Sequence, residues 1–215
     1  MVVLRSLTLA GRFITLEGGE GVGKSTQLVR LTEALRAKGK AVVTTREPGG
    51  TPGAEAIRDL LMTGSTDRWS ARAEALLFAA ARADHVERVI RPALERGDWV
   101  LCDRFIDSTR AYQGGAGELS NDEIMALHGF GSGGLLPDRT LLLALPHDQA
   151  EARASARDGA TSDRFGEKSA DYHRRLGAAF EVFATAEPDR FRRIDAHGGV
   201  DVVTERLLAA LADLL

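Results

Sequence analysis

Cysteine is almost absent from this chain of 215 residues, because Cys102 is the only one. A single cysteine cannot form an internal disulfide or a cysteine-cluster zinc site, and it is typical of a reducing compartment. Long apolar runs are also missing, since none approaches the roughly 18 residues that a membrane-spanning helix needs. Residues 1–10 contain Arg5 and indicate a short tail, not a signal peptide. We therefore expect a cytoplasmic protein with no membrane partner.

Neither sign of charge dominates the sequence. Lys and Arg number 28 against 31 Asp and Glu, and the net charge is -3. This balance argues against broad nucleic-acid binding, although it leaves room for a local basic pocket. With 44% hydrophobic residues the chain can bury a sizeable core. The length fits one α/β domain over residues 1–215.

Strand-like and helix-like segments alternate along the chain. Five short runs rich in apolar or β-branched residues predict buried strands at 12–17, 41–45, 99–103, 140–145 and 191–195. Helices are expected at 24–38, 54–62, 70–90 with a kink or restart at Pro92, from Ser120 onward, 147–157, 169–186 and 200–215. The alternation predicts an α/β fold with a parallel sheet of about five strands and helices on both faces.

A phosphate-binding motif follows the first predicted strand. The motif GxxxxGK[ST] is matched by the run Gly18, Gly19, Glu20, Gly21, Val22, Gly23, Lys24 and Ser25, and Thr26 continues into a helix. Glycines let backbone N–H groups surround phosphate oxygens, and the helix N-terminus favours an anion. Lys24 can reach the β- and γ-phosphates, and the Ser25 hydroxyl can bind Mg²⁺. The sequence therefore predicts a site for a nucleoside triphosphate such as ATP.

Two absences narrow the class of nucleotide-binding protein. Asn121 is the only asparagine, and the sequence has no NKxD motif of the kind that reads guanine in GTPases. It also has no LSGGQ-like signature of transporter ATPases. A small-molecule kinase with a P-loop NTPase-type fold is the leading interpretation.

Four further segments carry a resemblance to a known family. They are TREPGGT at 45–51, LFAAARADH at 77–85, DRFIDSTRAYQG at 103–114 and an arginine-bearing stretch at 153–164. Together with the P-loop they resemble the thymidylate kinases, a family of nucleoside-monophosphate kinases, from Arg12 to about Asp195. The resemblance implies transfer of phosphate from ATP, with Mg²⁺, to dTMP to give dTDP. It also implies a homodimer.

By resemblance, several residues would bind the nucleoside of dTMP. Phe78 and Arg82 lie four residues apart, hence on one helix face, where a ring can stack on thymine and a guanidinium can donate to it. On spacing alone, a core phenylalanine and an unrelated surface arginine would be favoured. Tyr112 would lie under the sugar and exclude a 2′-hydroxyl, or would pack in a loop. Thr109 and Gln113 are weaker candidates for base or sugar contacts.

Other residues would handle the phosphates. Arg46 follows a strand and would hold the acceptor phosphate, while Arg104 would bridge the two phosphates and act in catalysis with Lys24. Asp103 would orient Arg104 or act through metal-bound water, unless the pair is a salt bridge that only closes the loop. The family places an acidic residue at Glu20 against the 3′-hydroxyl of the sugar.

Residues 153–167 resemble the lid of such kinases. Gly21 stands where some members carry an arginine, so a lid arginine would complete catalysis, and Arg157 is the preferred candidate. Arg153 and Arg164 are available too, although a solvated helix face would explain both. The sequence departs from the family at Ala144, in place of a frequent aspartate, and at Ser155, in place of a lid arginine.

Two other functions stay open on the sequence. Another nucleotide or deoxynucleoside kinase could use the same P-loop, and an acceptor without a phosphate would leave Arg46 without a role. A regulatory protein could bind ATP with little turnover. The histidines show no metal-binding spacing, and Cys102 is expected to be a small core residue.

Overall fold

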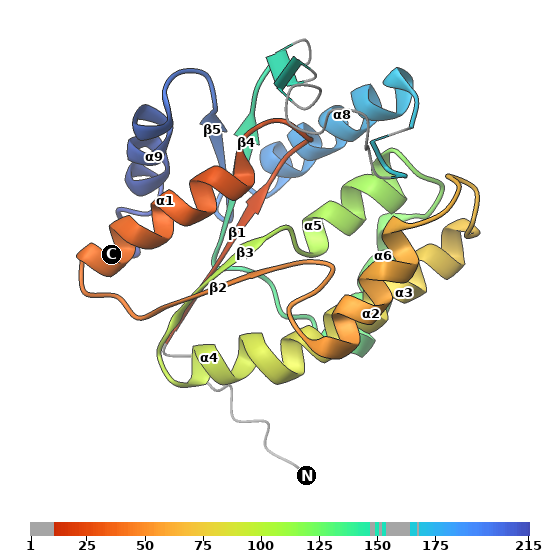
Figure 1. The fold of residues 1–215 in the computed structure, drawn as a ribbon, viewed down its shortest axis with the longest axis horizontal. Coiled ribbons are helices and arrows are strands. Elements are labelled where there is room, and N and C mark those ends of the chain that lie inside the picture. Colours follow the sequence, from red (N-terminus) through yellow and green to blue (C-terminus); the bar gives the residue numbers. More distant parts are fainter. Residues whose placement is uncertain (1–10, 147–148, 151, 154–163, 167) are drawn as a thin grey trace.

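A five-stranded sheet forms the centre of the molecule in the computed structural model, which describes residues 11–146, 149–150, 152–153, 164–166 and 168–215 (Figure 1). The strands are β1 Arg12–Glu17, β2 Val42–Arg46, β3 Trp99–Asp103, β4 Arg139–Ala144 and β5 Phe191–Asp195. Their order is β2-β3-β1-β4-β5, and every neighbouring pair is parallel. The α/β class with five parallel strands is confirmed, and only β2 and β4 are shifted, by one residue each.

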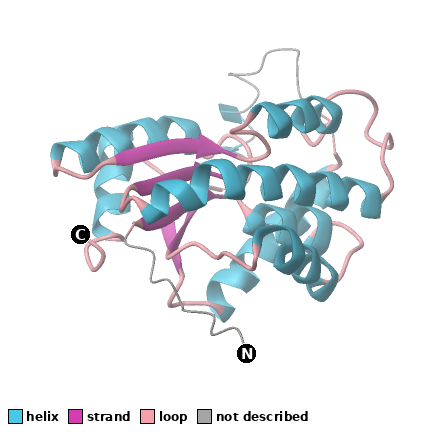
Figure 2. Ribbon diagram, turned by 90° about the horizontal axis from the view of Figure 1, so that it is seen from below, coloured by secondary structure: helices cyan, strands magenta, loops and turns pink. Residues whose placement is uncertain are grey.

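Helices cover both faces of this sheet (Figure 2). They are α1 Lys24–Ala37, α2 Pro52–Met62, α3 Ala71–His85, α4 Arg91–Glu95, α5 Ile106–Thr109, α6 Asn121–Ser132, α8 Ala170–Ala186 and α9 Val200–Ala209. Helix α1 packs on β1, β2 and β3, and α9 packs on β5. Across the described residues, no helix is both long enough and apolar enough to cross a bilayer.

The core follows the period of two that a buried strand imposes. Ile14 and Leu16 on β1 pack with Leu31 and Leu35 of α1. Phe13, which points to the other face, belongs to a second cluster with residues of α4 and the preceding turn. Because β1 is apolar on both faces, it takes the central position of a parallel sheet.

The helix expected over 70–90 is more complex than predicted. Helix α3 begins after its cap Ser70 and ends at His85, and a π-helical turn, Val86–Ile90, follows it. Helix α4 continues directly from that turn and has Pro92 in its first turn. Ile90 and Arg91 both keep right-handed helical dihedral angles, so the helix does not restart at Pro92.

Other boundaries differ by a few residues. Helix α2 begins at Pro52, two residues earlier than expected, because the Thr51 side chain caps it. Helix α9 ends at Ala209, not at residue 215. The capping box of Ser120 and Glu123 is confirmed at the start of α6. Of the helix expected at 147–157, residues 149–150 and 152–153 are helical, and the rest lies outside the described residues.

From Ile106 onward the segment 103–114 is helical, where the sequence indicated a loop. Helix α5 is followed directly by a π-helical turn, Arg110–Gly115. This compact segment packs against α8. It therefore holds the side chains after β3 in a rigid frame beside the carboxyl ends of the strands.

Candidate active site

The P-loop joins β1 to α1 and needs glycine at two points. Gly18 has φ 132°, and a Cβ there would lie 2.5 Å from the carbonyl oxygen of Leu143. Gly23 has φ 96° and stands at the N-cap of α1. Both conformations are open to glycine and strained for other residues. They turn the loop around the start of α1, where unpaired N–H groups and the helix dipole favour phosphate. Thr26 lies exposed on the first turn of α1.

Lys24 lies at the centre of this loop. Its side-chain nitrogen donates to the carbonyl oxygens of Gly18, at 3.1 Å, and Gly19, at 2.5 Å. Lys24 is 8% exposed. Burial, together with the nearby Arg104, lowers the pKa of Lys24 to about 7. An ammonium group so poorly solvated gains strongly from an anionic phosphate.

Ser25 and Asp103 face each other across the site. The Ser25 hydroxyl donates to Asp103 Oδ2 at 3.0 Å, while Asp103 Oδ1 is buried without a hydrogen-bond partner. A hydroxyl beside a free carboxylate oxygen fits Mg²⁺, which takes few protein ligands and the remainder from water and phosphate. In the part of the chain that the structure describes, no cluster of three or more His, Cys, Asp or Glu offers an all-protein metal site.

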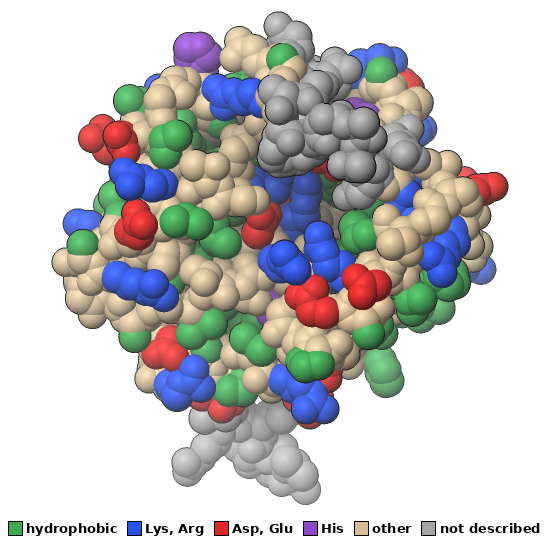
Figure 3. Space-filling view, in the orientation of Figure 1, with side chains coloured by type: hydrophobic (Ala, Val, Ile, Leu, Met, Phe, Trp, Pro, Cys, Tyr) green, Lys and Arg blue, Asp and Glu red, His purple; other side chains and the backbone are tan. Residues whose placement is uncertain are grey.

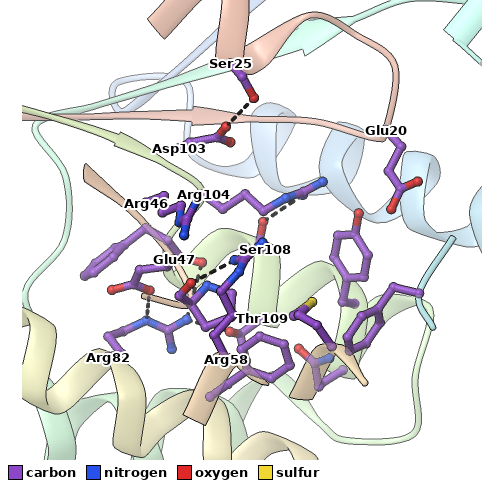
Figure 4. Close-up of a pocket in the computed structure, with 17 residues that line it drawn as sticks. Glu20, Ser25, Arg46, Glu47, Arg58, Arg82, Asp103, Arg104, Ser108 and Thr109 are labelled. Carbon is purple, nitrogen blue, oxygen red and sulfur yellow. Dashed lines mark hydrogen bonds and ion pairs between the residues drawn. The ribbon is translucent and has the colours of Figure 1, made fainter. Parts of the chain in front are cut away.

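Arg104 adopts a left-handed backbone conformation with φ 67°. Its NH1 group donates to the carbonyl oxygen of Gly18 at 3.1 Å and to Ser108 Oγ at 3.2 Å. Its guanidinium carbon lies 5.1 Å from the ring centre of Tyr112. The carboxylate of Asp103 accepts from Ser25, and among the described residues no ion pair joins it to Arg104. Arg104 extends over the cavity towards the side where Glu20 lies (Figure 4).

Glu17 is a fully buried carboxylate beneath this arginine. It accepts hydrogen bonds from the backbone N–H groups of Phe105 and Ser108, and from Ser108 Oγ at 2.6 Å. Burial, reinforced by the charge of Asp107, raises the pKa of Glu17 to about 7. In the sequence alone, Glu17 is only the last residue of a predicted strand, and this role is not visible. The signal available was a glutamate that directly precedes the P-loop.

A cavity connects the P-loop to the opposite side of the site. On the molecular surface, Lys and Arg side chains line a hollow in the middle of one face (Figure 3). Candidates from the sequence analysis that line this cavity are Glu20, Ser25, Arg46, Phe78, Arg82, Asp103, Arg104, Thr109, Tyr112 and Gln113. Their positions agree with their assignment to one site.

Aromatic rings form one end of the cavity. The rings of Phe78 and Tyr112 lie 5.9 and 6.0 Å from that of Phe165. The Tyr112 hydroxyl is buried, and the guanidinium carbon of Arg104 lies 5.1 Å from the centre of the same ring. Gln113 donates to Glu74 at 2.9 Å. Phe165 was not singled out from the sequence, because a lone phenylalanine in a polar segment carries no periodic signal.

Two arginines border the other end. Arg46 has 56% of its side chain exposed and pairs with Glu55 at 3.1 Å. Arg58 donates to the carbonyl oxygen of Pro48 and also lines the cavity. Arg58 was not predicted to belong to the site, because it lies on α2 and its position in the sequence is that of any surface arginine of an amphipathic helix.

The three arginines considered for the lid differ in where they lie. Arg157 lies outside the described residues, as does most of 153–167. The interpretation of Arg164 as a solvated residue is wrong, because it is 2% exposed. Its guanidinium donates to the carbonyl oxygens of Leu61, Ser65 and Thr66 and pairs with Glu74. Arg153 donates to the carbonyl oxygen of Ala196 at 3.5 Å.

The parallel sheet, the P-loop at its carboxyl edge and a basic cavity beside it define a P-loop phosphotransferase. Comparison with known proteins gives the family. Residues 16–207 match the thymidylate kinase family model, and the chain belongs to that family; it is an enzyme, a nucleoside-monophosphate kinase.

Individual relatives span nearly the whole chain. A thymidylate kinase of Rhizorhabdus wittichii is 60% identical over 207 residues, which cover 96% of this chain and 100% of the relative. One from Caulobacter vibrioides is 53% identical over 95% of this chain and 96% of the relative. The crystal structure of thymidylate kinase from Ehrlichia chaffeensis has 30% identity and a TM-score of 0.76, and the match covers 94% of this chain and 98% of that one.

Proposed function

We propose that this protein transfers the γ-phosphate of ATP to dTMP, giving ADP and dTDP for dTTP synthesis. The observation that carries the proposal is the single cavity in which Ser25, Asp103 and Arg104 of the P-loop side face Arg46, Phe78 and Tyr112. A donor and an acceptor nucleotide can meet only where both sets of groups open into the same space. We assign one domain, residues 1–215 with a lid at 153–167, and place the enzyme in the cytoplasm.

The P-loop binds the donor in this proposal. Backbone N–H groups of residues 18–25 surround the ATP phosphates, and Lys24 leaves its carbonyl partners to pair with the β- and γ-phosphates. Ser25, with Asp103 directly or through water, would hold Mg²⁺. The ion would neutralise charge on the phosphate oxygens.

The other side of the cavity binds the acceptor. Arg46 and Arg58 pair with the phosphate of dTMP, because a guanidinium presents donors in a fork that fits phosphate oxygens. Phe78, Tyr112 and Phe165 enclose the base and the sugar, and Arg82 donates to the base. Tyr112 leaves no room for a 2′-hydroxyl, Glu20 meets the 3′-hydroxyl, and Thr109 and Gln113 contribute to base or sugar contacts.

Phosphate transfer needs little proton chemistry. The attacking atom is a phosphate oxygen, which is largely ionised at neutral pH because the second pKa of a phosphate is about 6. Catalysis consists of aligning two anions and neutralising the charge of the transferred group. Arg104 would bridge the two phosphates, Lys24 would pair with the donor, and Arg157 would complete the charge from the lid.

The acceptor panel tests the proposal. ADP release is measured with ATP and Mg²⁺ against dTMP, dUMP, dCMP, dGMP, AMP, ribose TMP and thymidine. We expect strong turnover with dTMP, weaker turnover with dUMP, and little with the others. Replacement of Arg46 by methionine should raise KM for dTMP at least tenfold, since a charge-assisted contact is lost. Phosphorylation of thymidine as efficient as that of dTMP would contradict the proposal.

We also propose a homodimer. Helices α2, α3 and α6 pack side by side and expose Leu60, Leu76 and Phe130, of which Phe130 is 95% exposed. Exposed apolar side chains on neighbouring helices favour association with a second copy. Light scattering should give twice the mass of one chain for the wild type and the mass of one chain for the variant Leu76→Glu. A monomeric wild type would contradict the dimer.

A further inference from the structure

Glu47 is a buried carboxylate that the proposed chemistry does not use. It follows β2, and 3% of its side chain is exposed. Oε2 accepts from Arg82 Nε at 2.7 Å, and Oε1 meets His85 Nδ1 at 2.9 Å. A glutamate with both oxygens occupied holds its neighbours in place more firmly than a single contact would.

His85 in turn fixes the carboxylate. The ring is fully buried, and its Nε2 lies 2.6 Å from Thr45 Oγ1. Both ring nitrogens are satisfied when Nδ1–H donates to Glu47 and Nε2 accepts the Thr45 proton, a complete set for a neutral imidazole. The turn that follows Glu47 packs on the same ring, since a Cβ at Gly50 would lie 2.5 Å from His85 Nε2. Glu47 is therefore held by strand, turn and helix together.

Arg82 is held at two of its three nitrogens. Nε donates to Glu47, and NH2 donates to Thr109 Oγ1 at 2.7 Å. Because a guanidinium is planar, two fixed nitrogens determine the direction of the third. NH1 is the nitrogen left without a hydrogen bond to any described residue, and Arg82 lines the cavity. Glu47 and Arg82 face each other beneath the cavity, as Figure 4 shows.

We propose that Glu47 is a positioning residue for base selection: it orients Arg82 so that NH1 presents N–H donors to a pyrimidine with a carbonyl at C4. An amino group at C4, as in a cytosine nucleotide, would set donor against donor and leave both unpaired. The inference rests on the proposed reading of the base by Arg82. The new element is that selectivity for the base is lost when the hydrogen bond between Glu47 and Arg82 is removed, even though Arg82 is still present.

The test compares kcat/KM for dTMP and dCMP in two variants. Glu47→Met has similar length but no acceptor, whereas Glu47→Gln keeps an amide oxygen for Arg82 Nε. We expect the ratio of dTMP to dCMP to fall about 10- to 100-fold in Glu47→Met, the range for one charge-assisted hydrogen bond. Glu47→Gln should retain most of the ratio. Because partial unfolding lowers both rates alike, the ratio reports orientation and not folded fraction.

The same measurement in an Arg82→Met background separates the possible failures. If Glu47 acts through Arg82, Glu47→Met changes the ratio no further in that background. A ratio unchanged in Arg82→Met would overturn base reading by Arg82. Two outcomes would overturn the role of Glu47 alone. In one, Arg82→Met changes the ratio of dTMP to dCMP but Glu47→Met does not. In the other, Glu47→Met lowers the ratio equally in the wild type and in Arg82→Met. Should Glu47→Met fail to fold, Glu47→Asp withdraws the carboxylate from Arg82 Nε by one methylene group and must lower the ratio; an unchanged ratio would overturn the proposal.

Discussion

Glu17 makes the stability of this enzyme depend on pH at the scale of one residue. Its pKa in the folded protein, about 7, lies above the ordinary 4.5, so ionisation of Glu17 opposes folding. The stability present at low pH is therefore lost as the pH rises from about 4.5 through 7. The difference corresponds to roughly 3 kcal/mol at most. Glu17→Gln keeps the shape and the acceptor oxygen but removes the charge.

We expect Glu17→Gln to gain stability relative to the wild type as the pH rises from 5 to 8. Urea denaturation at each pH measures it. Glu118→Gln, on an exposed residue, is the matched control and should show no such trend. A gap between Glu17→Gln and wild type that stays constant with pH would contradict the raised pKa.

Lys24 should take up a proton when the donor nucleotide binds. Its lowered pKa, about 7, leaves the free amine largely neutral at pH 8. Phosphates favour the ammonium form and raise that pKa in the complex. Calorimetry of MgATP binding in two buffers of different ionisation enthalpy should show uptake approaching one proton at pH 8 and much less at pH 6. Equal uptake at both pH values would argue against this role for Lys24.

At the scale of elements, Asp107 joins α5 to the far edge of the sheet. It is fully buried and accepts from Arg110, Thr140 and Arg190. Although burial opposes ionisation, Arg190 and Arg110 hold the pKa of Asp107 below its usual value. Breaking a buried ion pair on one side costs about 3–5 kcal/mol. Asp107→Asn should lower the free energy of unfolding by about that amount in urea denaturation.

Asp171 provides the control for this network. It is 61% exposed and pairs with Arg174 and Arg175 on α8. Exposed pairs contribute about 0–1 kcal/mol, so Asp171→Asn should change stability little. Similar losses in Asp107→Asn and Asp171→Asn would mean that burial does not set the strength of these pairs.

Elements differed in how well the sequence predicts them. The strands were readable because burial on both faces requires continuous apolar runs, as in β1 and β3. The segment after Asp103 was not, since its helical path depends on Glu17 accepting the N–H groups of Phe105 and Ser108. Arg164 was misread for the same reason: its acceptors are carbonyl oxygens about 100 residues away.

For the molecule as a whole, ligand binding should stabilise the fold in proportion to affinity. A nucleotide at 100 times its Kd adds about 2.7 kcal/mol to the free energy of unfolding. We expect dTMP to raise Tm far more than thymidine at the same concentration, because Arg46 and Arg58 require a phosphate. Differential scanning fluorimetry measures both shifts. An equal shift with thymidine would show that the phosphate contributes nothing to binding.

The candidate site as a whole was largely predictable because motifs fix which residues end each strand. The P-loop, Arg46 and the pair Asp103 and Arg104 follow three strands that the sequence already indicated. Residues that act through tertiary contacts, such as Phe165, Arg58 and Glu47, could not be predicted from the sequence. Their roles arise from elements that meet only in the folded chain.

The strand order also determines the spacing between three parts of the site. The P-loop follows β1, Arg104 follows β3 and Arg46 ends β2, and these three strands lie side by side in the order β2-β3-β1. Adjacent strands lie about 4.8 Å apart, so the carboxyl ends of these three strands are evenly spaced across about 10 Å. That spacing is set by backbone hydrogen bonds, which most side-chain substitutions leave in place. The backbone therefore sets the spacing between the strand ends that carry the P-loop, Arg104 and Arg46, and the side chains must span the remaining gap to bring the two phosphates within reacting distance.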